Sequence, residues 1–156
     1  MSRRPRRIPR PVISDPLSLL RPVSPERSRG VMLAFLTALD EIARGKHPGV
    51  EEWRSLADCV NTLETLALTN DIFGEGVMPA VNAAIEAMAT AAKRYRAGHG
   101  MRLDGPGMEE LRTVIEIYGL CLKLLTERQM ALAQQRTQAR MRVLLRAGES
   151  EQVIAL

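Results

Sequence analysis

Five stretches of the chain repeat apolar residues at intervals of three and four positions, which is the spacing of one face of an α-helix. They run over about 25–44, 50–69, 77–97, 106–125 and 127–147. Leucine and alanine dominate the apolar residues, with 20 and 18 copies, whereas only five residues are aromatic. This mix favours closely packed helices over a β-sandwich. The sequence therefore predicts an all-α, single-domain bundle of four to five helices.

Capping residues mark where several of these helices begin and end. Ser24 and Asp104 precede the first and fourth helices, and serine and aspartate are preferred at that position because their side chains accept backbone N–H groups. Gly45, Gly98 and Gly148 follow the ends of the first, third and fifth helices, where glycine is a common stop. These signals predict the helix boundaries.

A capping signal also separates the fourth helix from the fifth. Thr126 and Gln129 have the spacing of a capping box, which would start a new helix. The alternative is one helix over 106–147, about 60 Å long, which would overhang a body of this size. We therefore expect two helices. Gly119, in the middle of the fourth, costs about 1 kcal/mol relative to alanine and so predicts close packing there.

The apolar positions also predict which side chains face the core. We expect the second helix to bury Trp53 and Leu63, and the third to bury Met88 and Tyr95. In the first helix the expected core residues are Met32, Phe35, Leu36, Leu39 and Ala43.

Positive charge is concentrated at the start of the chain. Residues 1–30 carry a net charge of +6 and residues 31–156 carry −2, which together give the formal charge of +4. Such a split indicates a basic arm joined to an ordinary body. We therefore divide the chain into a basic, proline-rich arm and connector at 1–23, a helical bundle at 24–148 and a C-terminal tail at 149–156.

The arm itself is predicted to have two parts. Five prolines within residues 1–23 favour extended or polyproline II backbone over helix. Residues 1–14 are expected to be disordered in isolation because their arginines repel each other. Residues 15–23 are expected to dock onto the bundle, with Leu17, Leu19 and Leu20 as the anchor.

The arginine run in the arm is the strongest functional signal in the sequence. Five permanent cations lie within eight residues, and the intervening prolines reduce the entropy lost on binding. Arginine pairs with phosphate through a planar fork, so such an arm can follow a DNA or RNA backbone or enter an A·T-rich minor groove. A solubilising tail and a peptide that docks on an acidic protein are the alternatives. The predicted phosphate-binding residues are Arg3, Arg4, Arg6, Arg7 and Arg10.

The fifth predicted helix is a second, weaker basic feature. Arg136 and Arg140 are four residues apart and share one face, while Arg142 and Arg146 share another. A merely solvated helix face is the alternative interpretation. An arm folded beside this helix would form one electropositive surface with it. Arg136 and Arg140 are therefore predicted to assist the arm in binding nucleic acid.

The sequence lacks the residue patterns of a metal centre or an enzyme active site. His47 and His99 lie in turns, and no spacing typical of zinc or di-iron ligands occurs. Cys59 and Cys121 lie in apolar helical patterns and are expected to be buried, reduced thiols, with a disulfide as the geometric alternative. The glycine-rich stretch 98–107 has a proline where a phosphate-binding loop needs lysine. We therefore expect no catalytic residues, metal, cofactor or small-molecule substrate.

The sequence shows neither a membrane-spanning segment nor a secretory signal, and this predicts where the protein is located in the cell. No uninterrupted apolar run approaches the ~18 residues that a membrane span needs. The basic N-terminus lacks the apolar core of a secretory signal. We therefore expect a cytoplasmic protein with no membrane partner.

Surplus apolar side chains support an alternative function. Leu120, Leu124, Val143 and Leu145 flank the predicted core faces and are not needed to fill them. Apolar residues left over in this way predict a protein–protein interaction module, either a homodimer or a modulator of a host protein, without a nucleic-acid role.

Four sequence patterns resemble a group of small uncharacterised helical proteins of proteobacterial phages, prophages and other mobile elements. These patterns are RPRRIPRP near the start, TALDEIARGKHPGVEEWRSLADCVN, RYRAGHGMRLDGPGMEELRTVIEIY and ARMRVLLRAGE near the end. Some of these proteins are labelled Fis-like transcriptional regulators. The resemblance implies a helical protein of the bacterial cytoplasm. This chain departs from the Fis-like pattern because it has no convincing C-terminal helix-turn-helix, and the resemblance carries over no catalytic residues.

Overall fold

The structure is a computed structural model, and it describes residues 17, 20–45, 47–69, 74–149 and 154. The described residues form five α-helices and no β-strand, which confirms the predicted all-α fold. The helices are α1 (Pro25–Arg44), α2 (Val50–Thr69), α3 (Gly74–Arg96), α4 (Gly105–Leu124) and α5 (Glu127–Arg146).

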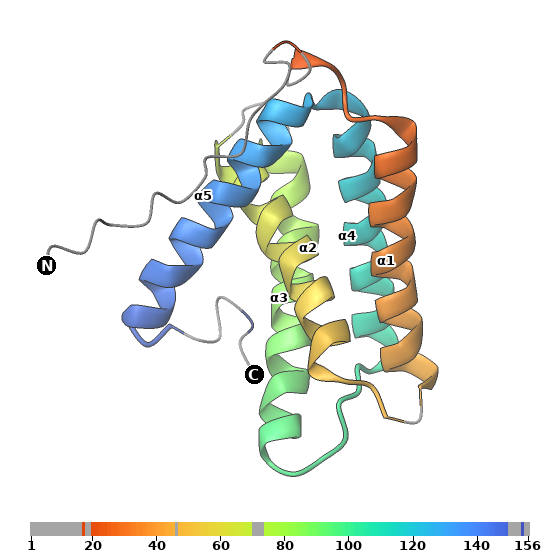
Figure 1. Cartoon of the computed structure of the whole chain (residues 1–156). Helices are drawn as coiled ribbons and strands as arrows, with labels where there is room; N and C mark the ends of the chain where they lie inside the picture. Colours follow the sequence, from red (N-terminus) through yellow and green to blue (C-terminus); the bar gives the residue numbers. More distant parts are fainter. Residues whose placement is uncertain (1–16, 18–19, 46, 70–73, 150–153, 155–156) are drawn as a thin grey trace, which may run out of the picture.

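The first four helices form an antiparallel bundle, and α5 crosses one side of it (Figure 1). Helix α1 packs against α2 and α4, and α3 packs against the same two helices. Helices α2 and α4 also touch across the centre of the bundle. Helix α5 packs mainly on α2, at an angle to the other four.

Helix α2 is the centre of the fold because it contacts all four other helices. Its predicted apolar face, which includes Trp53 and Leu63, is buried. Burial also extends to Asn61, Thr62 and Thr65, which the apolar pattern would leave at the surface. A polar stretch of α2 is therefore enclosed in the molecule.

The predicted capping residues perform their expected roles. Ser24 Oγ accepts a hydrogen bond from the backbone N–H of Arg27 at 3.2 Å, which caps α1. Asp104 Oδ1 accepts one from the N–H of Gly107 at 2.8 Å, which caps α4. Beyond α3, Gly98 adopts a φ of +89°, a conformation that side chains disfavour. Local chemistry thus fixes these ends of the helices.

The predicted break between α4 and α5 is confirmed. Leu125 has extended backbone, with φ −98° and ψ 150°, and its side chain is buried. Thr126 and Gln129 form a capping box, in which Thr126 Oγ1 accepts the Gln129 N–H at 3.2 Å and Gln129 Oε1 accepts the Thr126 N–H at 2.8 Å. This start redirects the chain, so that α5 returns across α2 instead of extending α4 (Figure 1).

The close packing predicted at Gly119 is also confirmed. A Cβ atom added to Gly119 would lie 2.8 Å from Cε of Met32 on α1. The missing side chain therefore lets Met32 sit directly against the backbone of α4.

Three residues predicted to face the core do not. Leu36 is 46% exposed, Tyr95 is 39% exposed, and Ala43 also lies at the surface. Helix α1 contacts only α2 and α4 extensively, so its fully buried strip is narrow and centres on Leu39 and Ile42. Tyr95 belongs to the last turn of α3, at the edge of the bundle. The apolar pattern is thus wider than the surface that the neighbouring helices cover.

Ile154 returns to the core near the end of the chain. Its side chain is buried, and its carbonyl oxygen accepts a hydrogen bond from Nε1 of Trp53 at 2.9 Å. The predicted division, with a separate tail at 149–156, did not anticipate this contact.

Candidate nucleic-acid interface

The connector that leads from the arm into α1 is hydrogen-bonded to the start of α5. The N–H of Val23 donates to the carbonyl oxygen of Leu125 at 3.1 Å, and the N–H of Glu127 donates to that of Arg21 at 3.0 Å. The side chain of Val23 is buried in the core. The connector is therefore fixed where it passes the first turn of α5.

The two described leucines of the expected anchor are not buried in the bundle. Leu17 and Leu20 are both exposed, and Leu19 lies outside the described residues. Backbone pairing and Val23 hold the connector instead. The predicted phosphate-binding residues of the arm also lie outside the described residues: Arg3, Arg4, Arg6, Arg7 and Arg10.

Glu127 is the side chain that joins the connector to α5. One of its carboxylate oxygens accepts the N–H of Ser24 at 3.4 Å, and the other forms an ion pair with Arg27 of α1. A carboxylate in the first turn of α5 is also favoured by the positive end of the helix dipole. The only acidic residue of α5 is thus occupied in this junction and does not offset the arginines further along the helix.

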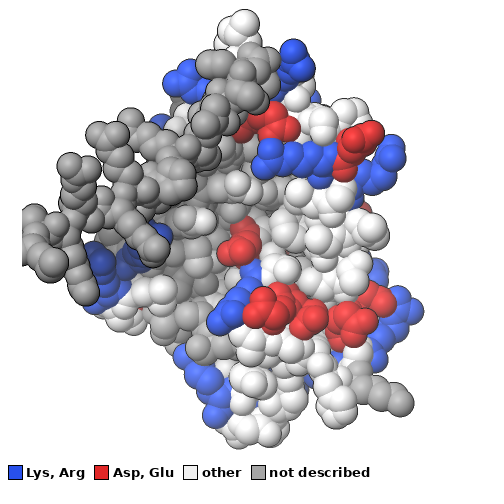
Figure 2. Space-filling view, viewed as in Figure 1, with Lys and Arg blue, Asp and Glu red and all other residues white. Residues whose placement is uncertain are grey.

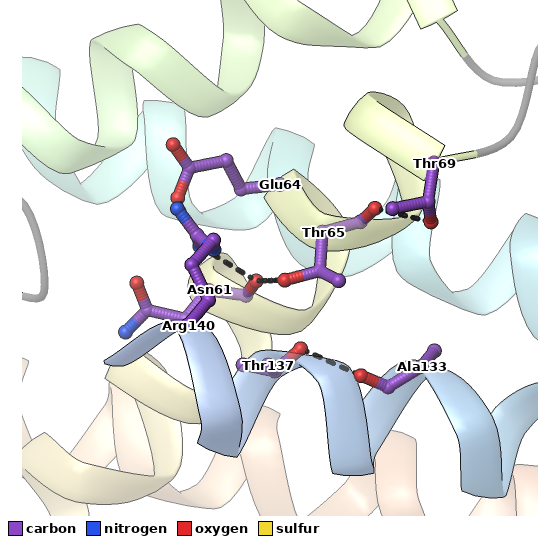
Figure 3. Close-up of polar contacts among 7 residues, drawn as sticks. All are labelled: Asn61, Glu64, Thr65, Thr69, Ala133, Thr137 and Arg140. Carbon is purple, nitrogen blue, oxygen red and sulfur yellow. Dashed lines mark hydrogen bonds and ion pairs between the residues drawn. The ribbon is translucent and has the colours of Figure 1, made fainter. Parts of the chain in front are cut away.

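The inner face of α5 holds the helix against α2. Met130, Ala133 and Thr137 are buried at intervals of three and four residues. The Thr137 hydroxyl donates to the carbonyl oxygen of Ala133 at 2.8 Å, so its burial leaves that hydroxyl hydrogen-bonded (Figure 3). This face is small, and most of α5 remains exposed.

Arg140 belongs to the inner face and does not point into solvent. Its Nη2 donates to Oε2 of Glu64 at 2.5 Å and to the carbonyl oxygen of Asn61 at 3.3 Å (Figure 3). The two side chains of the ion pair are only 24% and 14% exposed. Arg140 is therefore a structural link between α5 and α2, and its prediction as a phosphate contact needs correction. Sequence spacing placed it correctly beside Arg136 but could not show that Glu64 faces it.

The exposed arginines of α5 lie on its outer side. Arg128, Arg142 and Arg146 fall within about 40° of one another around the helix, opposite Ala133, at the usual 3.6 residues per turn. Arg136 is also exposed, about 80° around the helix from Arg128 and Arg146, where it borders a hollow between α5 and α2. None of these four arginines forms an ion pair with a described residue. We call Arg128, Arg136, Arg142 and Arg146 the basic face of α5.

Charges of opposite sign are distributed differently over the molecule. In Figure 2 most of the acidic side chains in view lie over α1 and α2, next to basic ones. Each of these two helices contains an ion pair of its own, Arg44 with Asp40 in α1 and Arg54 with Glu51 in α2. Helix α5 has no acidic residue between Arg128 and Arg146. The basic face can therefore present its charge to an anionic partner.

Sequence reasoning missed Arg128, Arg142 and Arg146 as site residues. The signal that could have found them is their spacing, since four and fourteen residues both return to nearly the same side of a helix. Spacing alone does not show which side of α5 packs on the bundle, because no side of this helix carries a continuous row of large apolar residues.

The two thiols are poorly suited to nucleophilic chemistry. Cys59 and Cys121 are both free and buried, as predicted. Burial raises the pKa of Cys121 to about 11, and burial together with the nearby charge of Asp58 raises the pKa of Cys59 further. Both thiols are therefore protonated at neutral pH, whereas the thiolate is the reactive form.

The described ranges hold neither a metal-binding cluster nor a membrane-spanning helix. They contain no group of three or more histidine, cysteine or carboxylate side chains that could hold a metal ion. None of the helices described is long and apolar enough to cross a membrane.

Comparison with protein families, with characterised proteins and with solved structures finds no match to this chain.

Proposed function

We propose that the protein is a non-enzymatic nucleic-acid-binding protein that contacts phosphates through its N-terminal arm and the basic face of α5. One observation carries the proposal. The backbone of Arg21 and Val23 is paired with residues 125 and 127, so the arm is attached beside the first turn of the helix that bears the basic face. The connector that follows the arm thus passes the start of α5, which supports joint action of the arm and the basic face.

The geometry of the basic face suits a phosphate backbone. Arg128 and Arg146 are separated by about 27 Å along the axis of α5, at 1.5 Å per residue. Double-stranded DNA offers one negative charge per ~1.7 Å of its axis, so widely spaced arginines can each find a phosphate without a defined base sequence. Contacts of this kind supply affinity and position but not sequence specificity.

We further propose that this binding serves an accessory or regulatory role in the cytoplasm of a bacterium that carries a phage or mobile element. The resemblance described above supports this part. It adds no target sequence.

Salt-dependent binding to generic duplex DNA tests the proposal. The variants are a deletion of residues 2–11 and the triple variant R128Q/R142Q/R146Q. The matched control is R29Q/R94Q/R96Q, which removes the same charge from exposed positions outside α5. Each phosphate contact contributes about 0.9 to the slope of log K against log salt. The deletion and the α5 variant should both lower this slope and weaken binding, and the control should do neither. Wild-type affinity and slope in the first two variants would reject the proposal.

A second candidate function is protein–protein interaction without a nucleic-acid role. The observation that favours it is the exposure of Leu120, Leu124, Val143 and Leu145, as the sequence predicted. This candidate is tested by sizing the protein over a range of concentrations and by pull-down. A strictly monomeric profile with no partner recovered counts against it.

A further inference from the structure

The seam between α1 and α4 contains two hollows that the fold does not fill. The upper hollow has a volume of about 500 Å³ and lies between the start of α1 and the end of α4. The lower hollow has a volume of about 370 Å³ and lies between the same two helices, further from the start of α1. In Figure 1 this seam is on the other side of the bundle from α5.

The upper hollow has an apolar floor and a basic residue on each side. Val23, Met32 and Leu122 form the floor, while Arg29 of α1 and Lys123 of α4 stand on opposite sides. Both cations are exposed, and neither forms an ion pair with a described residue. Among the described residues, no acidic side chain lines this hollow. An occupant that combines apolar and anionic groups would match both parts.

The lower hollow has a different charge balance. Leu36, Met108, Asp40 and Arg112 are among its lining residues. Asp40 is paired with Arg44, and Arg112 donates to a carboxylate oxygen of Glu109 at 3.4 Å. Because these charges are already paired, the exposed apolar surface of Leu36 is the main feature that a bound partner would contact.

Exposed leucines occur on both helices of the seam, outside the two hollows. Leu33 of α1 lines a further hollow between α1 and α2, and Leu120 and Leu124 are close to Lys123 on α4. Leu120 and Leu124 are 58% and 68% exposed. An apolar area with charged residues at its edge is typical of a protein-binding surface.

We propose that the α1/α4 seam binds an acidic amphipathic helix of a partner protein. The linings of the two hollows are centred about ten residues apart on α1 and about twelve apart on α4, which is roughly 14 to 19 Å at 1.5 Å per residue. Apolar side chains at positions i and i+11 of an incoming helix lie on one side of it about 16 Å apart, so one can enter each hollow. Carboxylates near the end that meets Arg29 and Lys123 complete the match. Met32 in the upper hollow is unbranched and adapts to the side chain it receives.

Charge argues for this occupant over a second copy of the chain. The exposed apolar residues of α5, Val143 and Leu145, lie among Arg142 and Arg146, and these arginines would be repelled by Arg29. The proposal is also independent of nucleic-acid binding, because no residue of the basic face of α5 lines either hollow.

Selection from a displayed library of helical peptides tests this inference. The library should carry apolar residues at i and i+11 with randomised flanking positions, and it should be panned on the full-length protein. The comparison variant is R29E/K123E, and the control variant R94E/R96E has the same charge change away from the seam. Wild type and control should enrich peptides with acidic flanks. The seam variant should bind those peptides at least tenfold more weakly and favour basic flanks.

Three outcomes would overturn the inference. The first is no enrichment on wild type, and the second is equal binding of the selected peptides to the seam variant. The third is concentration-dependent dimerisation that R29E/K123E abolishes, since a second copy would then cover the seam. Excess duplex DNA added during the selection separates this test from the proposed function. Peptide binding should persist in its presence, whether or not the protein binds DNA.

Discussion

Arg140 of α5 reaches across to Glu64 of α2, with 2.5 Å between the guanidinium Nη2 and a carboxylate oxygen. The same Nη2 also donates to the carbonyl oxygen of Asn61. Helix α5 buries only a small apolar face, and α2 is the main helix that it contacts. This polar link therefore helps to hold α5 in the orientation in which its basic face is exposed.

A double-mutant cycle should show that this ion pair stabilises the fold. We expect E64Q and R140Q to be strongly non-additive, with a coupling energy of about 1–3 kcal/mol, because the pair is largely shielded from water. The control cycle uses Glu51 and Arg54, an exposed pair in one helix, for which we expect less than about 1 kcal/mol. Urea denaturation provides the free energies of unfolding. Equal coupling in the two cycles would contradict a structural role for Arg140.

Arg140 also illustrates where sequence-based reasoning ends. Helical periodicity predicted correctly that Arg136 and Arg140 share a side of α5, because that depends only on the residues of one helix. Whether that side meets water or Glu64 depends on the angle at which α5 crosses α2. No local signal encodes this angle.

Local signals were sufficient where the cause is itself local. Ser24, Asp104 and Thr126 cap the helices that the sequence predicted they would start, because a cap needs only the next three residues. By contrast, Arg102 donates to the carbonyl oxygens of Ile42 and Gly45, at 2.6 Å each. A residue distant in sequence thus provides hydrogen bonds to free carbonyl groups at the C-terminal end of α1. Long-range contacts of this kind cannot be read from spacing.

Removal of the residues after Glu149 should expose Trp53. The Trp53 indole donates to the carbonyl oxygen of Ile154, whose side chain is buried. Trp53 is the only tryptophan in the chain, so its fluorescence reports on this site alone. We expect truncation to shift its emission to longer wavelength and to lower the free energy of unfolding by about 2 kcal/mol, mainly from the lost burial of one large apolar side chain.

The matched control for the truncation is I154A in the full-length chain. It keeps the backbone carbonyl that accepts the Trp53 N–H and removes only the buried side chain. We expect it to reduce stability with a smaller shift in emission. Wild-type emission and stability in the truncated protein would show that this contact does not hold Trp53.

Gly119→Ala should stabilise the protein even though the site is crowded. The nearest atoms to an added Cβ are Cε and Sδ of Met32, at 2.8 and 3.0 Å. These belong to the flexible end of a side chain that also borders the upper hollow, so Met32 can move into that space. Alanine then adds about 0.5–1 kcal/mol by restricting the unfolded chain and favouring the helix. G119V provides the contrast and should destabilise, because a branched side chain needs more room than Met32 can yield. Urea denaturation of both variants is the measurement, and a loss of stability in G119A would contradict this account.

The buried thiols should make stability fall in alkaline solution. The ordinary pKa of a cysteine thiol is 9.0, and burial raises the pKa of Cys121 to about 11 in the folded protein and that of Cys59 as well. Below pH 9 both thiols are neutral in the folded and unfolded states, and their contribution is constant. Above pH 9 the unfolded chain loses these protons first, so the free energy of unfolding should decrease as the pH rises towards 11.

The thiols' share of this decrease can be isolated with the double variant C59A/C121A. Tyr118, whose pKa burial also raises from 10.0, remains in that variant and destabilises the folded state at still higher pH. Between pH 9 and 10 the variant should therefore show a flatter stability profile than wild type, whatever its absolute stability. The same burial predicts that native protein reacts slowly with a thiol-specific reagent at pH 8 and reacts fully once unfolded in guanidinium. Rapid labelling of the native protein, or parallel profiles for the two proteins, would mean that the thiols are accessible to water.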